Sequence, residues 1–327
     1  MEEKKKKSKI IWWVMGIVLT LALVALALVF FFLSGVRATN SLSEPTLILV
    51  KNEDGINGIS DKLISKNVIA SKKLFYYYAK FNLVTIKAGY YEFPSGASIV
   101  SVVNQLRDGK TKIVKLTFPE GFRAEQMAIR LADSKVVSYA DFLIAARKYE
   151  GKLFPDTYFF NPIMTGEEVV KMMLDDYSDR TKDLVVTNHN LIVASIVEKE
   201  SSNDADRPLI AGIYLNRVKA GMKLQSDPTV AYGRDTNALA KLSESAQKEY
   251  TFWKAAKTVE FTSVISPYNT YLNSLPIGPI CNPGIKSIEA TLNPQTSNYY
   301  YFLYGRDGKI YPAKTQAEHE ANVAKYM

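Results

Sequence analysis

Two glutamates close the apolar stretch LIVASIVEKESS, residues 191–202, and they are the strongest candidates for chemistry in the chain. An apolar environment raises the pKa of a carboxylic acid, as a general acid working near neutral pH requires. A helix that continues through Glu198 and Glu200 separates them by roughly 200°. Glu200 lies one turn after the bulky Ile196 and Val197. We therefore predict that Glu200 is the acid and that Glu198 points toward solvent or a structural partner. The alternative interpretation is a helix end with two solvated glutamates.

Other catalytic residue sets are missing from the sequence. No glycine-rich phosphate loop, HExxH, GxSxG or CxxC motif occurs in a usable context. The single cysteine, Cys281, excludes an internal disulfide, and with only His189 and His319 beside it we predict no metal site and no cofactor. Carboxylate chemistry is what remains.

The formal charge of +8 is concentrated at one end of the chain. Five lysines lie within residues 4–9, and the remaining basic residues are scattered rather than gathered in a patch with aromatic residues. The sequence therefore does not predict nucleic-acid binding.

Residues 10–33, IIWWVMGIVLTLALVALALVFFFL, carry no charge and are long enough for a helix that crosses a hydrocarbon core of about 30 Å. The preceding lysines predict that residues 1–9 stay in the cytoplasm and that the rest is exported, as in a single-pass protein of the cell membrane. A cleaved signal peptide is the alternative, although its apolar region usually has only about 7–15 residues. Residues 34–45 are polar and suit a linker.

The next part of the chain contains an internal duplication. Residues 46–110 and 111–182 both read as strand, glycine turn, two helices, aromatic strand and a further helix. Asn67-Val68-Ile69 aligns with Lys135-Val136-Val137, and a serine that can cap a helix follows each, at Ser71 and Ser138. We predict two related α+β modules. Chance similarity of amphipathic helices is the alternative.

Residues 183–327 differ in character and form the predicted catalytic domain. Apolar periodicity predicts a helix over Leu209–Val218 that Gly221 can end, and a polar helical run over Leu242–Lys257. The strand YYYFLYG, residues 299–305, leads into a hairpin turn at 305–308. The whole chain is therefore expected to be of the α+β class.

Four motifs in order carry a resemblance to a known family. ASIVEKES, AGIYLNRVKAGMKLQSDPTVAYG, YNTY and LPIGPICNPG resemble the membrane-anchored endolytic murein transglycosylases, the YceG-like family. The resemblance implies an N-terminal transmembrane helix, LysM-like modules and a lysozyme-like lytic transglycosylase domain. It also implies cleavage of the β-1,4 bond between N-acetylmuramic acid and N-acetylglucosamine within peptidoglycan glycan strands, leaving 1,6-anhydro ends during cell-wall synthesis. Implied partners are peptidoglycan synthases and the elongation or division machinery.

The same resemblance places the catalytic acid on the second glutamate of EKE, Glu200, in agreement with the helix-face argument. One carboxyl group then protonates the glycosidic oxygen and afterwards takes the proton of the muramic acid 6-hydroxyl, which closes onto C1. Gln225 is expected to bond an N-acetyl group, and Tyr268, Asn269 and Tyr271 are expected to line the groove. Hydrogen bonds that only lock the loop are the alternative for these last three.

Asp227, in QSDP, reads first as a turn or helix-capping residue and otherwise as a substrate contact or second catalytic carboxylate. A second carboxylate would indicate a muramidase that uses water. A glycan-binding scaffold without activity is a further alternative. Asn216 and Arg217 are expected to brace the catalytic helix.

Overall fold

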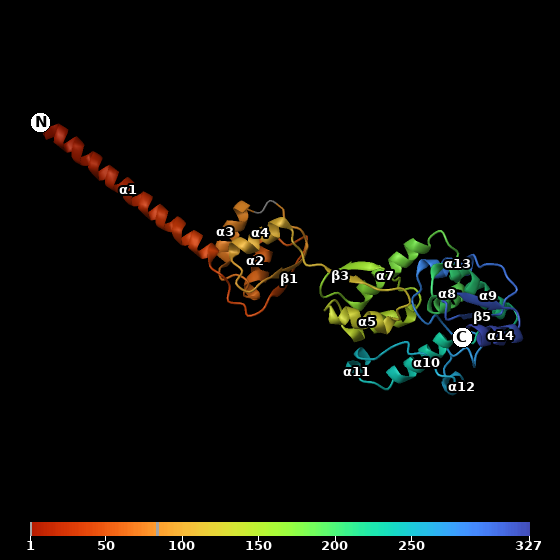
Figure 1. Ribbon diagram of the computed structural model, residues 1–327. Helices are drawn as coiled ribbons and strands as arrows, with labels where there is room; N and C mark the ends of the chain where they lie inside the picture. Colours follow the sequence, from red (N-terminus) through yellow and green to blue (C-terminus); the bar gives the residue numbers. More distant parts are fainter. Residues whose placement is uncertain (1, 83–84) are drawn as a thin grey trace. The chain divides into compact units, whose positions relative to one another are not determined.

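The computed structural model describes residues 2–82 and 85–327, with side chains from residue 11 onward (Figure 1). Met1, in the predicted tail, and residues 83–84, in the first predicted module, lie outside the described residues. Contacts divide the chain into two compact units, and the boundary between them in the sequence lies between Ile113 and Val114. Each unit is described by itself.

The first unit begins with a long helix, α1, over Glu2–Arg37. Its segment Ile11–Arg37 is long and apolar enough to cross a membrane. The most apolar part of the segment has a mean hydropathy of 2.9 and none of it is buried. The helix continues four residues beyond the predicted end at Leu33. Val36 is fully buried in the core of the unit and Phe32 packs against that core, so the predicted linker 34–45 begins inside the helix.

After this helix the first unit folds into a small α+β module. Its elements are β1 (Thr46–Val50), α2 (Ile56–Ser65), α3 (Lys72–Asn82), β2 (Gly89–Phe93) and α4 (Ile99–Asp108). The two strands are antiparallel, and Ile48 lies opposite Tyr91 on the buried face.

The second unit opens with the same order of elements. These are β3 (Val114–Thr117), α5 (Ala124–Asp133), α6 (Tyr139–Ala146), the short 3-10 helix η1 (Arg147–Tyr149), β4 (Thr157–Phe160) and α7 (Gly166–Thr181). Strands β3 and β4 pair antiparallel, as β1 and β2 do.

The aligned residues Asn67 and Lys135 share an unusual backbone conformation. Their φ angles are 56° and 57°, in the left-handed region, directly after α2 and α5. The next amides donate back into the ended helices, from Val68 to Leu63 and from Val136 to Leu131, and both valines are buried. This is the Schellman arrangement, which satisfies the last carbonyls of a helix and turns the chain. The two modules thus share a specific helix ending as well as an element order.

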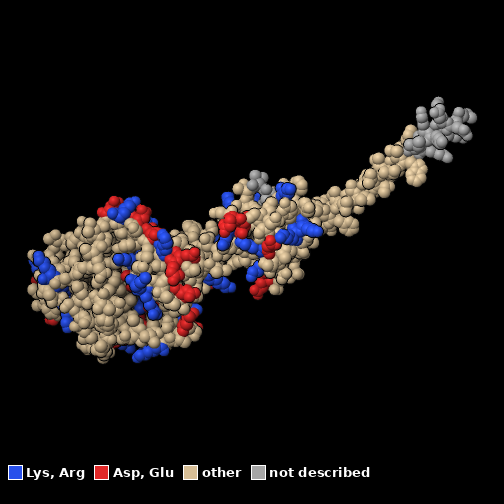
Figure 2. Space-filling model, turned by 180° about the vertical axis from the view of Figure 1, so that it is seen from behind, with Lys and Arg blue, Asp and Glu red and all other residues tan. Residues whose placement is uncertain are grey.

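The rest of the second unit is mainly helical. It contains α8 (Asn188–Glu200), η2 (Asp204–Asp206), α9 (Arg207–Lys219), α10 (Asp227–Leu239), α11 (Glu244–Lys248), α12 (Glu260–Ser263), α13 (Ile285–Leu292), the antiparallel hairpin β5 (Tyr301–Tyr304) and β6 (Ile310–Ala313), and α14 (Gln316–Tyr326). Helix α8 contacts α9 and α13, and its residues 191–197 are all buried. On the face seen in Figure 2, Lys and Arg are interspersed with Asp and Glu.

The polar helix predicted over Leu242–Lys257 is wrong, because only Glu244–Lys248 is helical there. The buried carboxylate of Asp235 accepts hydrogen bonds from the Tyr250 hydroxyl (2.9 Å) and the Trp253 amide (3.0 Å). Trp253 has a φ of 61°, outside the helical region. A tertiary contact with a buried acid therefore replaces the helix that local propensity favours.

Candidate active site

Glu200 is the last residue of α8 and lies at the inner end of a cavity. The helix begins with a capping box between Thr187 and Asn190 and then runs through a fully apolar stretch. Its C-terminal end points the partly buried Glu200 side chain at α9 and at the start of α10. Tyr214 donates a hydrogen bond to Oε1 of Glu200 over 2.9 Å, and Ser226 donates to the same oxygen over 2.6 Å.

The two oxygens of Glu200 are therefore not equivalent. Oε1 is held by two hydroxyl groups, whereas Oε2 accepts no hydrogen bond from the part of the chain that the structure describes. An acid proton placed on Oε2 is free to move to a bound molecule.

Burial raises the pKa of Glu200 above its ordinary value of 4.5, and the negative charge of Asp227 raises the pKa further. The hydrogen bonds from Ser226 and Tyr214 and the charge of Arg217 act in the opposite direction, but the net change of the pKa is upward. The carboxylate also lies at the negative end of the α8 dipole, which disfavours its ionised form. Glu200 thus holds its proton to a higher pH than a solvated glutamate does.

Ser226 reaches Glu200 because of an unusual helix start. It occupies the N-cap position of α10, where a serine oxygen normally accepts a bond from a backbone amide of the first turn. Here the side chain makes no capping bond, and the hydroxyl donates to Glu200 instead. The preceding Gln225 has a φ of 50°, so the chain enters this helix through a left-handed residue.

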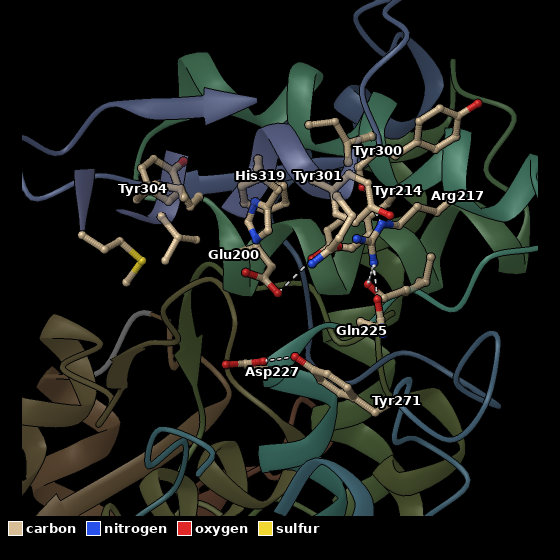
Figure 3. Close-up of a pocket in the computed structure, with 17 residues that line it drawn as sticks. Glu200, Tyr214, Arg217, Gln225, Asp227, Tyr271, Tyr300, Tyr301, Tyr304 and His319 are labelled. Atoms are coloured by element: carbon tan, nitrogen blue, oxygen red, sulfur yellow. Dashed lines mark hydrogen bonds between the residues drawn. The ribbon is translucent and has the colours of Figure 1, made fainter. Parts of the chain in front are cut away.

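The cavity beside Glu200 has a volume of about 470 Å³ and is walled largely by aromatic side chains. Figure 3 shows Glu200, Tyr214 and Arg217 on one side and the hydrogen-bonded pair Asp227 and Tyr271 on the other. The residues that line the cavity are Glu200, Ile213, Tyr214, Arg217, Leu224, Gln225, Asp227, Tyr271, Tyr300, Tyr301, Phe302, Leu303, Tyr304, Gln316, His319, Val323 and Met327. Aromatic rings with a few polar groups are a common lining for sites that bind sugars and other small molecules.

Arg217 organises one wall of this cavity rather than offering a free charge to it. It is 7% exposed and its guanidinium donates to the carbonyl oxygens of Leu224 and Tyr300. It also lies 4.9 Å from the ring centre of Tyr301. Arg217 therefore connects α9 to the loop before α10 and to the β5 hairpin. Asn216 makes a second connection from α9, through hydrogen bonds to two carbonyls just before the hairpin.

Three of the predicted substrate contacts line the cavity. Tyr271 donates to Oδ1 of Asp227 over 2.7 Å, and Asp227 is the first residue of α10. The Gln225 side chain also lies at the cavity, where its Oε1 accepts a hydrogen bond from Arg217 over 3.3 Å.

The other two predicted contacts lie outside the cavity lining. Tyr268 packs edge-on against Tyr232, with ring centres 4.6 Å apart. Asn269 is fully buried, and its side chain donates to the carbonyls of Phe261 and Val264 and accepts from the Tyr271 amide. The hydrogen bonds of Asn269 lie within and next to the loop that carries Tyr271, and substrate contact by Tyr268 or Asn269 stays a prediction.

Glu198 points to the opposite side of α8, into a charged cluster. Its side chain is 6% exposed and accepts hydrogen bonds from Arg207 (3.0 Å), Ser287 (2.9 Å) and the Gly284 amide (3.0 Å). It is the structural partner of Arg207 and does not line the cavity of Glu200.

The described residues contain no group of His, Cys, Asp and Glu side chains that could hold a metal ion. Cys281 is buried, and its thiol donates to the Ser195 carbonyl.

A carboxylic acid of raised pKa in the lining of a cavity is the arrangement that general acid–base catalysis uses. The model of the YceG-like family matches residues 48–325, and the chain therefore belongs to this family. It is 31% identical over 319 residues to the endolytic murein transglycosylase of Bacillus subtilis, an alignment that covers 86% of this chain and 84% of that protein.

Two further comparisons agree with this assignment. The endolytic murein transglycosylase of Streptococcus pneumoniae serotype 2 is 29% identical over 323 residues, and the alignment covers 83% of this chain but only 56% of that longer protein. The crystal structure of a YceG-like protein from Listeria monocytogenes is 31% identical, with a TM-score of 0.51, covering 85% of this chain and 99% of that one.

Sequence reasoning missed several residues that the cavity brings together. Tyr214 and Ser226 hold the acid, yet Tyr214 reads as one more apolar position of an amphipathic helix and Ser226 as a helix cap. Tyr304 and His319 come from the hairpin and α14, about a hundred residues further along the chain. The repeated Tyr-Tyr-Tyr of residues 299–301 was the one visible signal for this wall.

Proposed function

We propose that Glu200 is the catalytic acid and base of a peptidoglycan lytic transglycosylase. The chain is an enzyme of this class, as the names of its relatives indicate. The observation that carries the residue assignment is the asymmetric carboxyl group, with Oε1 held by Tyr214 and Ser226 and Oε2 unbonded within the described chain.

The reaction uses one carboxyl group twice. Protonated Glu200 donates its proton from Oε2 to the glycosidic oxygen between N-acetylmuramic acid and N-acetylglucosamine, and the bond to C1 breaks. The resulting carboxylate accepts the proton of the muramic acid 6-hydroxyl, whose oxygen bonds to C1. The product carries a 1,6-anhydro ring, no water is consumed, and Glu200 ends the cycle protonated.

The surrounding residues support both states of the acid. The hydroxyls of Tyr214 and Ser226 stabilise the carboxylate that forms after the first step. Burial and the charge of Asp227 raise its pKa, which favours the protonated form before that step. We assign sugar binding to Gln225, Asp227 and Tyr271, which line the cavity, and positioning of the Tyr271 loop to Tyr268 and Asn269.

The substrate is the peptidoglycan glycan strand, cut within its length during cell-wall synthesis. Helix α1 supports a single-pass anchor in the cell membrane, with the N-terminus in the cytoplasm and residues after it outside. The two β-α-α-β-α modules are proposed to be LysM-like, and the region after them to be lysozyme-like. Peptidoglycan synthases and the elongation or division machinery are the proposed partners.

Mass spectrometry of the products tests this proposal. Purified full-length protein is incubated with uncrosslinked glycan strands, and the ends are identified by mass. We expect anhydro ends with the native chain and none with Glu200→Gln. Reducing ends, heavier by one water, would overturn the transglycosylase in favour of a hydrolase.

A muramidase remains the second candidate because Asp227 lines the same cavity as Glu200. In that reaction the second carboxylate would position water or stabilise the charged sugar. The Asp227→Asn variant discriminates between the two reactions. A transglycosylase keeps a measurable rate and still makes anhydro ends, whereas a muramidase loses at least about a hundredfold in rate.

A further inference from the structure

His319 belongs to the C-terminal helix α14 but lines the same cavity as Glu200. Figure 3 shows its imidazole directed from α14 toward the Glu200 carboxyl group. Segments more than a hundred residues apart in sequence thus place an imidazole and a carboxyl group in the lining of one cavity.

The orientation of the ring is fixed by stacking. The imidazole lies on the ring of Tyr301, with centroids 5.6 Å apart and planes 26° from parallel. The other contact of Tyr301 is the guanidinium of Arg217, which is itself bonded to backbone carbonyls. This layered arrangement holds the imidazole edge at one place in the cavity wall.

The two nitrogens of His319 have different surroundings. Nδ1 is buried and has no hydrogen-bond partner among the described residues. Nε2 also makes no bond to the described chain but is not buried, so it opens onto the cavity. Buried N–H groups without an acceptor are rarer than buried acceptors without a donor, which assigns the single proton of the neutral ring to Nε2.

The charges around His319 favour that neutral ring. Burial lowers its pKa below the ordinary value, the nearby Arg217 lowers the pKa further, and Glu320 opposes them. At neutral pH the imidazole therefore offers one N–H donor to the cavity.

We propose that His319 is a substrate-binding residue that donates from Nε2 to a hydroxyl or acetamido oxygen of the sugar bound beside Glu200. The inference rests on the proposed function, because it takes the ligand to be an N-acetylated glycan. It gives α14 a direct part in binding and adds a hydrogen-bond donor to the wall that contains Tyr300, Tyr301 and Tyr304.

Two variants separate the donor from the ring. His319→Phe keeps an aromatic ring against Tyr301 and removes the donor, whereas His319→Gln removes the ring and keeps an N–H donor. Both are made in the full-length protein, and KM and kcat are measured on uncrosslinked glycan strands. We expect His319→Phe to raise KM about tenfold with kcat changed less than threefold, and His319→Gln to stay within threefold of the native KM.

Binding without turnover gives a second measurement. In the Glu200→Gln background, His319→Phe should weaken the affinity for the same strands about tenfold. Glu320→Gln is the matched control on α14, since Glu320 is exposed and does not line the cavity, and it should leave KM unchanged.

Loss of binding in both His319 variants, or in neither, overturns the donor role. The Tm of each variant shows whether folding is intact, and a variant that lowers Tm without changing KM also counts against the role. Anhydro ends are recorded in every assay, so that failure of this inference is distinguishable from failure of the proposed reaction.

Discussion

The hydroxyl of Ser226 donates to Oε1 of Glu200 over 2.6 Å, although Ser226 occupies a position whose usual work is to cap a helix. The residue that begins one helix thereby stabilises the ionised form of the residue that ends another. This hydrogen bond lowers the pKa of Glu200 against the stronger effect of burial. The balance between the two sets the pH range of the acid.

Replacing Ser226 by alanine should shift that balance. Without the hydroxyl the pKa of Glu200 rises further, so the fall in kcat/KM on the alkaline side should move to higher pH. The maximum should drop about tenfold because the carboxylate formed in the reaction loses a donor. A pH profile from pH 4 to 9 measures both effects.

Ser243→Ala is the matched control, because Ser243 caps α11 through its side chain and lies outside the cavity lining. It should cost about 1 kcal/mol of stability and leave the pH profile in place. An unchanged alkaline limb in Ser226→Ala would show that the serine does not tune the acid.

Replacing Glu200 by glutamine should lower kcat at least about a hundredfold. The same substitution should stabilise the fold at neutral pH. The folded state binds the Glu200 proton more tightly than the unfolded state, so this group costs stability once the pH exceeds its ordinary pKa of 4.5. The cost grows by about 1.4 kcal/mol for each pH unit until the folded pKa is passed. Thermal unfolding should therefore give equal Tm values near pH 4 and a higher Tm for the variant near pH 8. A difference in Tm that does not depend on pH would contradict the raised pKa.

Replacing Glu198 by glutamine should produce the reverse pattern. The side chains of Glu198 and Arg207 are 6% and 9% exposed, so loss of this carboxylate removes the most buried acidic partner of Arg207 and leaves it only the more exposed Asp204 (3.1 Å) and Glu120 (3.8 Å). We expect a loss of about 3 kcal/mol, with kcat/KM within about tenfold of the native value below the lowered Tm. Calorimetry and the glycan assay on one preparation measure both. Loss of activity in Glu198→Gln with activity kept in Glu200→Gln would place the acid on the other face of α8.

Asn282 joins the second module to the loop before α13 within the second unit. Its Oδ1 accepts from the amides of Gly151 (2.8 Å) and Leu153 (2.9 Å), and its Nδ2 donates to Glu150 (2.7 Å) and to the Phe122 carbonyl (3.1 Å). Asn282→Ala leaves the amides of Gly151 and Leu153 without this acceptor, although Glu150 keeps the Ala124 amide and the Phe122 carbonyl keeps the backbone amide of residue 282. The variant should destabilise the protein by about 3 kcal/mol.

Asn237→Ala serves as the comparison, since Asn237 is exposed and makes one hydrogen bond, to the Ile265 carbonyl. It should cost less than about 1 kcal/mol. Equal Tm values for the two variants would mean that Asn282 does not join these segments.

Local pattern was enough to predict the elements whose residues decide their own structure. Helix α9 and the β5–β6 hairpin follow apolar periodicity and turn residues, and α8 follows its apolar stretch to Glu200. The duplicated turn at Asn67 and Lys135 was visible as an alignment, although its left-handed backbone was not.

The parts that sequence did not reveal depend on contacts between distant segments. Asp235 holds residues 250–253 out of a helix, and Asn269 is buried although its loop looks exposed by composition. Helix α14 was not predicted, and with it the wall that carries His319 was missed. Only the fold reveals which tyrosines face the acid and which face the core.

The burial of Val36 limits how readily a protease can separate the apolar helix from the rest of the first unit. Val36 is part of the first unit's core, yet it lies only three residues after the apolar run ends at Leu33. A protease that cuts between Leu33 and Val36 needs this part of α1 to unwind, but Val36 is packed in the core of the unit. Cleavage there should be slow in the folded protein, which time-resolved proteolysis in detergent can measure. The packing of Val36 therefore protects the connection between the apolar helix and the rest of the first unit from cleavage.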